Sequence, residues 1–469
     1  MNSVNRRDFV KTGAAAATAA GFAGCMTAGA GNAKLAFLGG TPIVSKAEAA
    51  NYKKLFHWPI VNDAMRKAND RVLCAGTMSG WDIADEFEKK FAAWNGTKYA
   101  SSAPNGTASL IAAFYAIGLG PGDELICPSI TYWASCLGAI HLGATVVFAD
   151  IDPETLTLDP KSFEAHITPR TKAVVPVHVY GQPCDMDPIM AIAKKHGIKV
   201  VEDVSHAQGG LYKGRKLGTI GDCGAMSLMS SKSFAIGEGG MLVTDDKEIY
   251  RRVVRWGQYE RIKRDFTAQE IVRTNNLPFG GVKNRLNQCS AAIGIEQLKK
   301  YDAECEVICK AMEYYHDGIK DVKGITKIYP KWENSNKAGW YYSRSLYNPE
   351  AFDGVSVDTF CRALNSELSQ SKYGPGCNFP LHTSNIFDDA DIFGNGVSPA
   401  KRFLPAGVTP KGLTGRLPVA ESILPRVIGD PMFKLFEKEH IDKYIEAVHK
   451  VAANTGALRD WEKKNSVKS

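Results

Sequence analysis

Two residues that end or follow apolar runs of the chain could act together in chemistry. Lys232 stands between Met-Ser-Leu-Met-Ser-Ser and Ser-Phe-Ala-Ile-Gly-Glu-Gly-Gly, a tight, glycine-rich setting in which desolvation would lower the pKa of its amine. Asp203 closes the run Lys-Val-Val-Glu-Asp, and an acid at a buried strand end can pair with a protonated ring nitrogen and make a pyridine ring an electron sink. Most single lysines are solvated surface residues, so the neighbours of Lys232 decide between the two interpretations.

A phosphate-binding element is predicted upstream of this pair. Asn105, Gly106 and Thr107 precede an Ala- and Leu-rich helix, so small residues expose the first backbone N–H groups of that helix. The partial positive charge of these groups suits a phosphate. An ordinary helix N-cap is the alternative interpretation of the same residues.

The elements that position these residues follow from the hydrophobic pattern. Continuous apolar runs such as Ala-Val-Val-Pro-Val-His-Val predict strands buried on both faces, and the helix predicted over 188–196 ends at Gly197. Strands that alternate with helix-length segments predict βαβ units and a mostly parallel sheet, with ligands at the carboxyl ends of its strands. The predicted strands are 124–127, 144–150, 173–179, 198–204, 225–229 and 241–244.

Length and composition predict a globular protein of two or three domains. The chain has 469 residues, of which 44% are hydrophobic, enough to bury a large core. Past Tyr301 the strand rhythm gives way to a long helix, irregular sequence over 373–417 and an amphipathic run over 437–453. We therefore expect a large domain over 34–300 and a smaller C-terminal α/β domain over 301–469.

The first 33 residues have the pattern of an export signal. Arg6 and Arg7 are followed by Phe9, Lys11 and a short Ala-rich run, which is typical of twin-arginine signals. The segment Phe-Ala-Gly-Cys then resembles a lipobox, with Cys25 as the acylated residue. We expect an exported, periplasmic protein whose only membrane attachment is a lipid anchor at Cys25; an ordinary N-terminal tail is the alternative.

Charge and cysteine usage exclude other classes. A formal net charge of +7 is a mild excess for this length and predicts no nucleic-acid partner. Apart from Cys25, ten cysteines are scattered without a CxxC pair, and many stand in apolar runs. This pattern favours buried thiols over a disulfide framework, and we expect no metal site.

The order and spacing of these motifs resemble a known enzyme family. Val-Glu-Asp-Val-Ser-His-Ala-Gln-Gly-Gly, Met-Ser-Leu-Met-Ser-Ser-Lys and Gly-Glu-Gly-Gly-Met-Leu-Val-Thr closely resemble segments of the DegT/DnrJ/EryC1/StrS sugar aminotransferases. The resemblance runs from Gly39 to Leu298 and thins beyond about residue 310. It implies the pyridoxal-phosphate transferase fold of type I, similar to aspartate aminotransferase, and a homodimer with a shared active site.

The resemblance also implies roles for individual residues. Lys232 would form the internal aldimine with pyridoxal phosphate and later move protons, and Asp203 would pair with the pyridine nitrogen. Gly106, Thr107 and Ser227 would hold the phosphate. Tyr132 would stack on the cofactor ring and His206 would lie beside the ring hydroxyl. The family's loop that reaches the neighbouring subunit's phosphate is Gly-Val-Lys-Asn-Arg here, which offers Lys283; the residues expected near substrate are Arg285 and His382.

The predicted function is transfer of an amino group from glutamate or glutamine to a keto-sugar or keto-cyclitol. A dehydratase of the same family carries His in place of the lysine, so Lys232 argues against that activity. Two alternatives stay open. One is an exported pyridoxal-phosphate or sugar sensor without catalysis, and the other is an epimerase or eliminase, since all these reactions begin at the same lysine.

Overall fold

The computed structural model describes residues 34–258, 261, 266–274, 277–392 and 394–465. The predicted export signal, with Arg6, Arg7 and Cys25, lies outside these residues. Within the described ranges, no helix has the length and apolar character needed to cross a bilayer.

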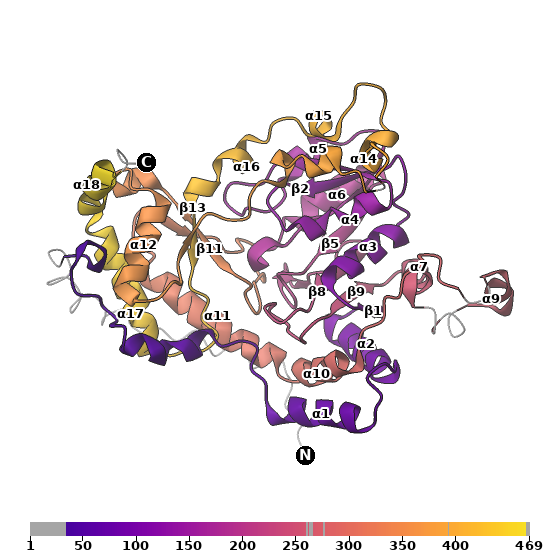
Figure 1. Cartoon of the computed structure of the whole chain (residues 1–469), viewed down its shortest axis with the longest axis horizontal. Helices are drawn as coiled ribbons and strands as arrows, with labels where there is room; N and C mark the ends of the chain where they lie inside the picture. Colours follow the sequence, from indigo (N-terminus) through magenta and orange to yellow (C-terminus); the bar gives the residue numbers. More distant parts are fainter. Residues whose placement is uncertain (1–33, 259–260, 262–265, 275–276, 393, 466–469) are drawn as a thin grey trace, which may run out of the picture.

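A seven-stranded sheet forms the centre of the larger half of the molecule (Figure 1). Its order is β1-β9-β8-β5-β4-β2-β3, and every neighbouring pair is parallel except the two that involve β9. The mostly parallel sheet predicted from the sequence is confirmed. The strands are β1 (Tyr99–Ala103), β2 (Glu124–Pro128), β3 (Thr145–Ala149), β4 (Thr171–Val174), β5 (Lys199–Asp203), β8 (Cys223–Ser227) and β9 (Gly240–Thr244).

Two of these strands differ from the prediction. The strand expected over 173–179 ends at Val174, because Pro176 has no N–H to donate to the ladder; the chain rejoins the sheet only by a bridge from Val177 to Asp203. β1 was not predicted, since Tyr-Ala-Ser-Ser-Ala lacks an apolar run. Its Ser102 is buried, and Glu88 satisfies its polar groups by accepting from both the N–H and the hydroxyl, each at 2.6 Å.

Helices cover both faces of the sheet and give a three-layer α/β/α arrangement. One hydrophobic core lies between the sheet and α3, α4 and α7, and a second lies between the opposite face and α2, α5, α6 and α10. The predicted helix that stops at Gly197 is α6, where Gly197 caps the end with a left-handed φ of 68°. The bounds are α2 (Asp82–Asn95), α3 (Gly106–Ala116), α4 (Gly138–His141), α5 (Pro160–Ala165), α6 (Met186–His196), α7 (Lys247–Gly257) and α10 (Gln288–Leu298).

The smaller half of the molecule contains a four-stranded antiparallel sheet packed against helices. Its strand order is β10-β11-β13-β12, and the long helix α11 runs into it from the larger half (Figure 1). The amphipathic run predicted over 437–453 forms α17. The elements are α11 (Tyr301–Gly318), β10 (Ile325–Lys327), β11 (Ser343–Tyr347), α12 (Val357–Leu368), β12 (Gly374–Pro375), β13 (Val427–Asp430), α17 (Lys438–Ala452) and α18 (Thr455–Asn465).

Two segments cross the predicted domain boundary at residue 300, which itself stays a prediction. Residues 34–56 pack into the core of the smaller half, where Leu35 and Leu55 are fully buried among side chains of α11, α12 and α17. In the other direction, side chains between Leu381 and Val427 complete the core that covers α3 and α4. This return segment carries α13 (Ile386–Asp389), α14 (Pro399–Arg402), α15 (Pro410–Thr414) and α16 (Pro418–Ser422).

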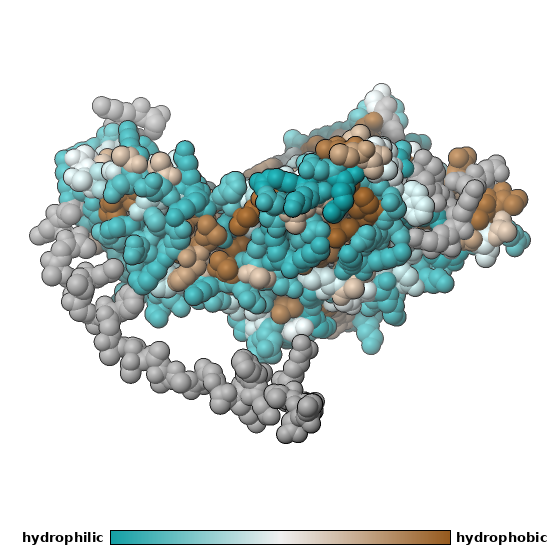
Figure 2. Space-filling model, turned by 90° about the horizontal axis from the view of Figure 1, so that it is seen from below, coloured by the Kyte–Doolittle hydropathy of each residue, from teal (hydrophilic) through white to brown (hydrophobic). Residues whose placement is uncertain are grey.

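A short arm projects from the larger half and carries hydrophobic side chains into solvent. It includes α9 (Ala268–Thr274) and lies at the right of Figure 1. Val272, Leu277 and Phe279 are 74%, 65% and 55% exposed. In Figure 2 hydrophobic residues gather at this end of the molecule.

Candidate active site

Adjacent parallel strands bring Lys232 and Asp203 to the same edge of the sheet. β5 ends at Asp203, which pairs in register with Ala225 of β8, and Lys232 stands in the loop that follows β8. Both side chains are buried, with Asp203 3% and Lys232 8% exposed. Burial lowers the pKa of Lys232 to about 8, and the negative charge of Asp203 limits that decrease. The amine is therefore more readily deprotonated than that of a surface lysine.

Neutral donors hold the Asp203 carboxylate in place. Its Oδ2 accepts a hydrogen bond of 2.7 Å from the hydroxyl of Ser135, and its Oδ1 accepts one of 3.0 Å from the backbone N–H of Ser205. The Ser135 hydroxyl in turn contacts Thr131 Oγ1 at 2.8 Å. Among the described residues, these two donors orient the carboxylate.

Gly106, Thr107 and Ser227 meet where α3 begins beside the end of β8. A Cβ on Gly106 would lie 2.5 Å from Ser227 Cβ, so only glycine permits this approach. Asn105 caps the helix by accepting from Ala108 N at 2.9 Å, which leaves the N–H groups of Gly106 and Thr107 for a ligand. The N-cap and the anion-binding interpretations of this motif are therefore compatible.

A series of aromatic rings continues from Lys232. The Lys232 Nζ lies 4.0 Å from the ring centroid of Tyr341, which lies 4.3 Å from the ring of His206. The His206 ring stacks on Tyr180 at 6.1 Å, and its Nδ1 accepts from the Tyr180 N–H at 3.2 Å. Burial, together with the cations of Lys232 and Arg344, holds the pKa of His206 well below its usual value. The ring is therefore neutral at pH 7, with its proton on Nε2.

Tyr341, Tyr180 and Arg344 were not predicted as site residues. Tyr180 stands in the Tyr-Gly-Gln-Pro motif directly after an apolar run, and its left-handed φ of 55° is a second signal. Tyr341 lies in a segment where Ala338, Trp340 and Tyr342 all have φ between 47° and 51°. Such backbone is unusual for residues other than glycine and has no signature in the sequence pattern.

Contacts from both halves of the molecule fix the Lys232 loop. The indole Nε1 of Trp58 donates to the backbone oxygen of Lys232 at 2.8 Å. The buried Nζ of Lys434 donates to the carbonyls of Gly339 and Trp340, each at 3.1 Å, and lies over the Trp58 ring. A Cβ on Gly339 would lie 2.8 Å from Ser233 Cβ, so the segment that carries Tyr341 packs directly against the residue after Lys232.

The other predicted residues lie in more open surroundings. Tyr132 is 49% exposed, with its ring 4.9 Å from that of Trp133. Burial, with a smaller contribution from the neighbouring Tyr342, raises the pKa of Tyr341 to about 12. Lys283 is exposed and Arg285 is partly buried, and their predicted roles stay predictions.

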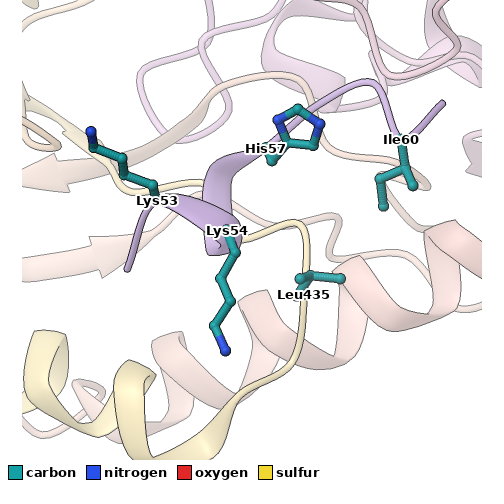
Figure 3. Close-up of a pocket in the computed structure, with 5 residues that line it drawn as sticks. All are labelled: Lys53, Lys54, His57, Ile60 and Leu435. Atoms are coloured by element: carbon teal, nitrogen blue, oxygen red, sulfur yellow. The ribbon is translucent and has the colours of Figure 1, made fainter. Parts of the chain in front are cut away.

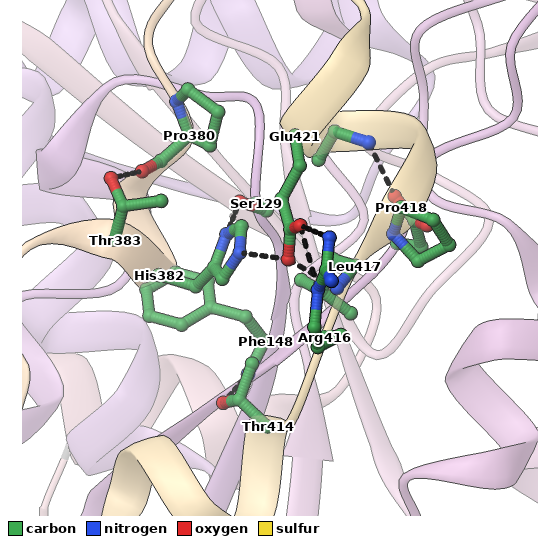
Figure 4. A network of polar contacts seen from close by, with 12 residues as sticks. Ser129, Phe148, Pro380, His382, Thr383, Thr414, Arg416, Leu417, Pro418 and Glu421 are labelled. Carbon is green, nitrogen blue, oxygen red and sulfur yellow. Dashed lines mark hydrogen bonds and ion pairs between the residues drawn. The ribbon is translucent and has the colours of Figure 1, made fainter.

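His382 lies in a polar network that joins the return segment to the end of β2 (Figure 4). Its Nδ1 is 2.7 Å from the Ser129 hydroxyl, and its Nε2 is 3.4 Å from Glu421 Oε1. The Arg416 guanidinium, and the backbone N–H of Leu417, lower the pKa of Glu421 to about 2. Both ring nitrogens of His382 therefore have protein partners, and its predicted contact with substrate stays a prediction.

A separate pocket of about 390 Å³ lies where the N-terminal segment meets the smaller half (Figure 3). Lys53, Lys54, His57, Ile60 and Leu435 line it, and none of the predicted site residues does. Its two lysines and its histidine are exposed, and Lys54 pairs with Glu437 at 2.8 Å. The buried lysine and acid, not this surface hollow, therefore identify the candidate active site.

Comparisons with a family model, with related proteins and with solved structures all find aminotransferases or sugar-related enzymes. Residues 60–396 match the model of the DegT/DnrJ/EryC1/StrS aminotransferase family. The GDP-perosamine synthase of Caulobacter vibrioides is 44% identical over 234 residues, 50% of this chain and 61% of that protein. The L-glutamine:2-deoxy-scyllo-inosose aminotransferase of Streptoalloteichus tenebrarius is 32% identical over 445 residues, 91% of this chain and 99% of that protein. Among solved structures, the aminotransferase from Psychrobacter cryohalolentis has a TM-score of 0.71 at 28% identity, covering 86% of this chain and 100% of that chain.

Proposed function

The chain belongs to the DegT/DnrJ/EryC1/StrS aminotransferase family, and from this premise we propose that Lys232 bonds pyridoxal phosphate and that the enzyme aminates a keto-sugar or keto-cyclitol. The amino donor is glutamine or glutamate. The observation that carries the proposal is the buried Lys232 amine beside the buried Asp203 carboxylate at neighbouring strand ends. The relatives named for GDP-perosamine and for a glutamine-dependent inosose amination support the classes of acceptor and donor.

The residues of the site fit this cofactor. Lys232 Nζ lies beside the Tyr341 ring, and its lowered pKa of about 8 makes the neutral, bond-forming amine accessible near neutral pH. The N-terminus of α3, opened by Gly106 and flanked by Ser227, suits a phosphate group. Asp203 suits a protonated ring nitrogen, and the Nε2–H of the neutral His206 suits a ring hydroxyl.

Each residue then has a chemical task. Pyridoxal phosphate supplies an aldehyde for amine exchange and a ring that delocalises negative charge. Lys232 Nζ, with its lowered pKa, takes the proton from the donor's α-carbon and later returns one, as a general base and acid. Asp203 holds the proton on the ring nitrogen. The two engaged oxygens of Asp203 keep its carboxylate in one orientation throughout.

An absorbance experiment tests the proposal. The protein reconstituted with pyridoxal phosphate should show a visible band that is missing in Lys232→Ala and retained in Lys299→Ala, a change at an exposed lysine. Glutamine or glutamate should then remove the band and release a keto acid, and a keto-inositol or a nucleotide-linked keto-sugar should restore it. An unchanged band with every amino acid would overturn transamination in favour of the sensor, epimerase or eliminase alternatives.

We further propose that the enzyme acts as a homodimer in which the hydrophobic arm contacts the second copy. Leu277 and Phe279 are exposed hydrophobic side chains close together in the chain, and Lys283 follows them at the expected phosphate-contacting loop. Leu277→Asp with Phe279→Asp should yield a monomer in sedimentation experiments. Val307→Asp on α11, at a position of 40% exposure, should leave the dimer intact.

The export route is also a proposal and rests on the N-terminal pattern. Arg6 and Arg7 would direct the folded, cofactor-loaded enzyme through the twin-arginine pathway, and Cys25 would carry the lipid. Replacing both arginines with lysine should keep the protein in the cytoplasm. Cys25→Ser should release it from the membrane fraction, and a wild-type protein found only in the cytoplasm would exclude the route.

A further inference from the structure

We propose that Gln208 is a positioning residue, which holds the phosphate-contacting Ser227 and the reactive Lys232 in a fixed relation to each other. This role rests on the proposed use of pyridoxal phosphate and adds a residue that acts through its neighbours. Gln208 stands in the chain shortly after β5 ends at Asp203, and its side chain is fully buried.

The amide nitrogen of Gln208 joins the ends of two neighbouring strands. Its Nε2 donates to the backbone oxygen of Ser205 at 3.1 Å and to that of Ser227 at 2.5 Å. Both acceptors are carbonyl oxygens, which cannot donate, so they fix which way the amide faces. Ser205 closely follows Asp203, and Ser227 is the last residue of β8. Gln208 therefore links the strand that carries the acid to the strand that carries the phosphate contact.

The amide oxygen of Gln208 reaches the loop of the reactive lysine. Its Oε1 accepts a hydrogen bond of 2.5 Å from the hydroxyl of Ser233, the residue directly after Lys232. Ser233 is only 1% exposed, and a hydroxyl at this depth needs a partner inside the protein. One planar amide thus contacts three segments of the site, and both its nitrogen and its oxygen are engaged.

The Ser227 residue is held through both of its backbone polar groups. Its N–H donates to the hydroxyl of Ser205 at 3.0 Å, and its carbonyl oxygen accepts from Gln208. The N–H of Ser205 in turn donates to Asp203 Oδ1 at 3.0 Å. A displacement of Gln208 would therefore act on the phosphate-contacting serine and on the Asp203 carboxylate together.

The backbone of Gln208 is itself anchored. The hydroxyl of Tyr301, at the start of α11, donates to the backbone oxygen of Gln208 at 2.8 Å, and Tyr301 is fully buried. The Tyr301 ring also packs at 4.9 Å against that of Phe234, which follows Ser233 in the lysine loop. The amide therefore extends from a fixed point, as a side chain that positions others must.

A fixed relation between the phosphate site and the amine has a measurable consequence. Binding of a phosphate speeds bond formation at Lys232 only when the two sites are in register, because binding at a remote group then orients the reacting one. Pyridoxal is the same aldehyde without the phosphate and cannot use this effect. The preference of Lys232 for the phosphorylated aldehyde therefore reports on the register that Gln208 would hold.

The rates of visible-band formation with pyridoxal phosphate and with pyridoxal measure this preference on the full chain freed of cofactor. Gln208→Met keeps the length of the side chain and removes the amide, so the preference should fall about 10-fold through the lost hydrogen bonds. Gln288→Met is the matched control. Gln288 is also fully buried, and its amide bonds backbone groups near the start of α2, donating to Thr77 O at 3.1 Å and accepting from Ile83 N at 2.8 Å. It should keep the wild-type preference.

Urea unfolding separates positioning from general packing. Both methionine variants should lose stability to a similar degree, and only Gln208→Met should lose the preference. Ser233→Ala removes one hydrogen bond to the amide and should lower the preference about 3- to 5-fold. It serves as the test if Gln208→Met does not fold. A wild-type preference in the folded variant, whichever of the two is measured, would overturn the assignment.

The half-reaction with glutamine, in which the amino group passes to the cofactor, gives a second readout. With saturating pyridoxal phosphate its rate should fall about 10-fold in Gln208→Met and stay unchanged in Gln288→Met. Equal rates in the two variants would count against the role of Gln208. A wild-type protein that forms no band with either aldehyde would overturn the proposed function and this role with it, whereas an unchanged preference in Gln208→Met would overturn this role alone.

Discussion

Burial and neutral hydrogen-bond donors largely determine the pKa and the orientation of single side chains in this site. Asp203 is held by Ser135 and the Ser205 N–H, and the amine of Lys232 lies over the ring of Tyr341. The charge of Asp203 and the orientation given by Ser135 can therefore be separated by mutation.

Asp203→Asn should lower the rate of the glutamine half-reaction at least 100-fold, because an amide cannot hold the ring proton. Ser135→Ala keeps the charge and removes one hydrogen bond worth about 1 kcal/mol, so its rate should fall by only about 5- to 10-fold. Stopped-flow absorbance measures both rates. An Asp203→Asn rate within tenfold of wild type would contradict the role assigned to the carboxylate.

The lowered pKa of Lys232 predicts how the cofactor-free protein reacts with pyridoxal phosphate. The neutral amine is the nucleophile, and with a pKa of about 8 roughly one tenth of Lys232 is neutral at pH 7, against fewer than about one in a thousand for an ordinary lysine. The rate of band formation should therefore rise from pH 6 and level off above about pH 8. A rate that still rises tenfold per pH unit at pH 9 would show that the amine titrates like a surface lysine.

The residues of the site differ in how far the sequence predicts them. Asp203 and Ser227 end their strands and Lys232 stands in the loop after β8, so a local pattern indicates their position at the sheet edge. Tyr341 and Arg344 reach the site through tertiary packing. The carbonyl contacts of Lys434 and left-handed backbone turn that segment toward Lys232, and neither leaves a local pattern in the sequence.

At the scale of elements, the hydrophobic pattern predicts where strands occur better than it predicts whether they run parallel or antiparallel. Apolar runs identified six strands of the sheet because buried parallel strands are continuously hydrophobic. β9 has the same composition but runs antiparallel to both neighbours, since the short loop that carries Lys232 returns the chain directly beside β8. β1 depends on Glu88 to accept the hydrogen bonds of its buried Ser102, which no local pattern predicts.

The turn between β5 and β8 depends on one buried carboxylate. Glu202 Oε1 accepts from the N–H groups of Ile220 and Gly221, each at 2.7 Å, and Oε2 accepts from Gly218 at 2.8 Å and lies 3.1 Å from His178 Nε2. Glu202→Gln turns an NH₂ group toward these donors and should lower the free energy of unfolding by about 2 to 4 kcal/mol.

Urea unfolding followed by circular dichroism measures this change. The control is Glu248→Gln, whose side chain is 71% exposed and pairs with Arg251 on the surface; it should change stability by less than about 0.5 kcal/mol. Equal effects of the two substitutions would contradict the anchoring role of Glu202.

At the scale of the whole molecule, the N-terminal segment holds the two halves together. Leu55 is fully buried in the core of the smaller half, and Trp58 a few residues later binds the Lys232 backbone. Leu55→Ala should therefore destabilise the protein by about 2 to 5 kcal/mol through the cavity it leaves. Leu73→Ala, at a position of 54% exposure, is the matched control and should have little effect in thermal or urea unfolding.

The domain arrangement was only partly predictable, because part of it depends on contacts between residues that are remote in sequence. The change of rhythm past Tyr301 indicates a second domain, because local composition changes there. The return of residues 34–56 to that domain depends on packing against α11, α12 and α17, contacts that are remote in sequence.

The burial of Leu35 limits how far the enzyme could stand from a bilayer. Only about ten residues separate it from Cys25, and a fully extended chain of that length reaches roughly 35 Å, less than the width of the folded protein itself. An acylated Cys25 would therefore keep the smaller half close to the lipid headgroups and restrict the enzyme's tumbling.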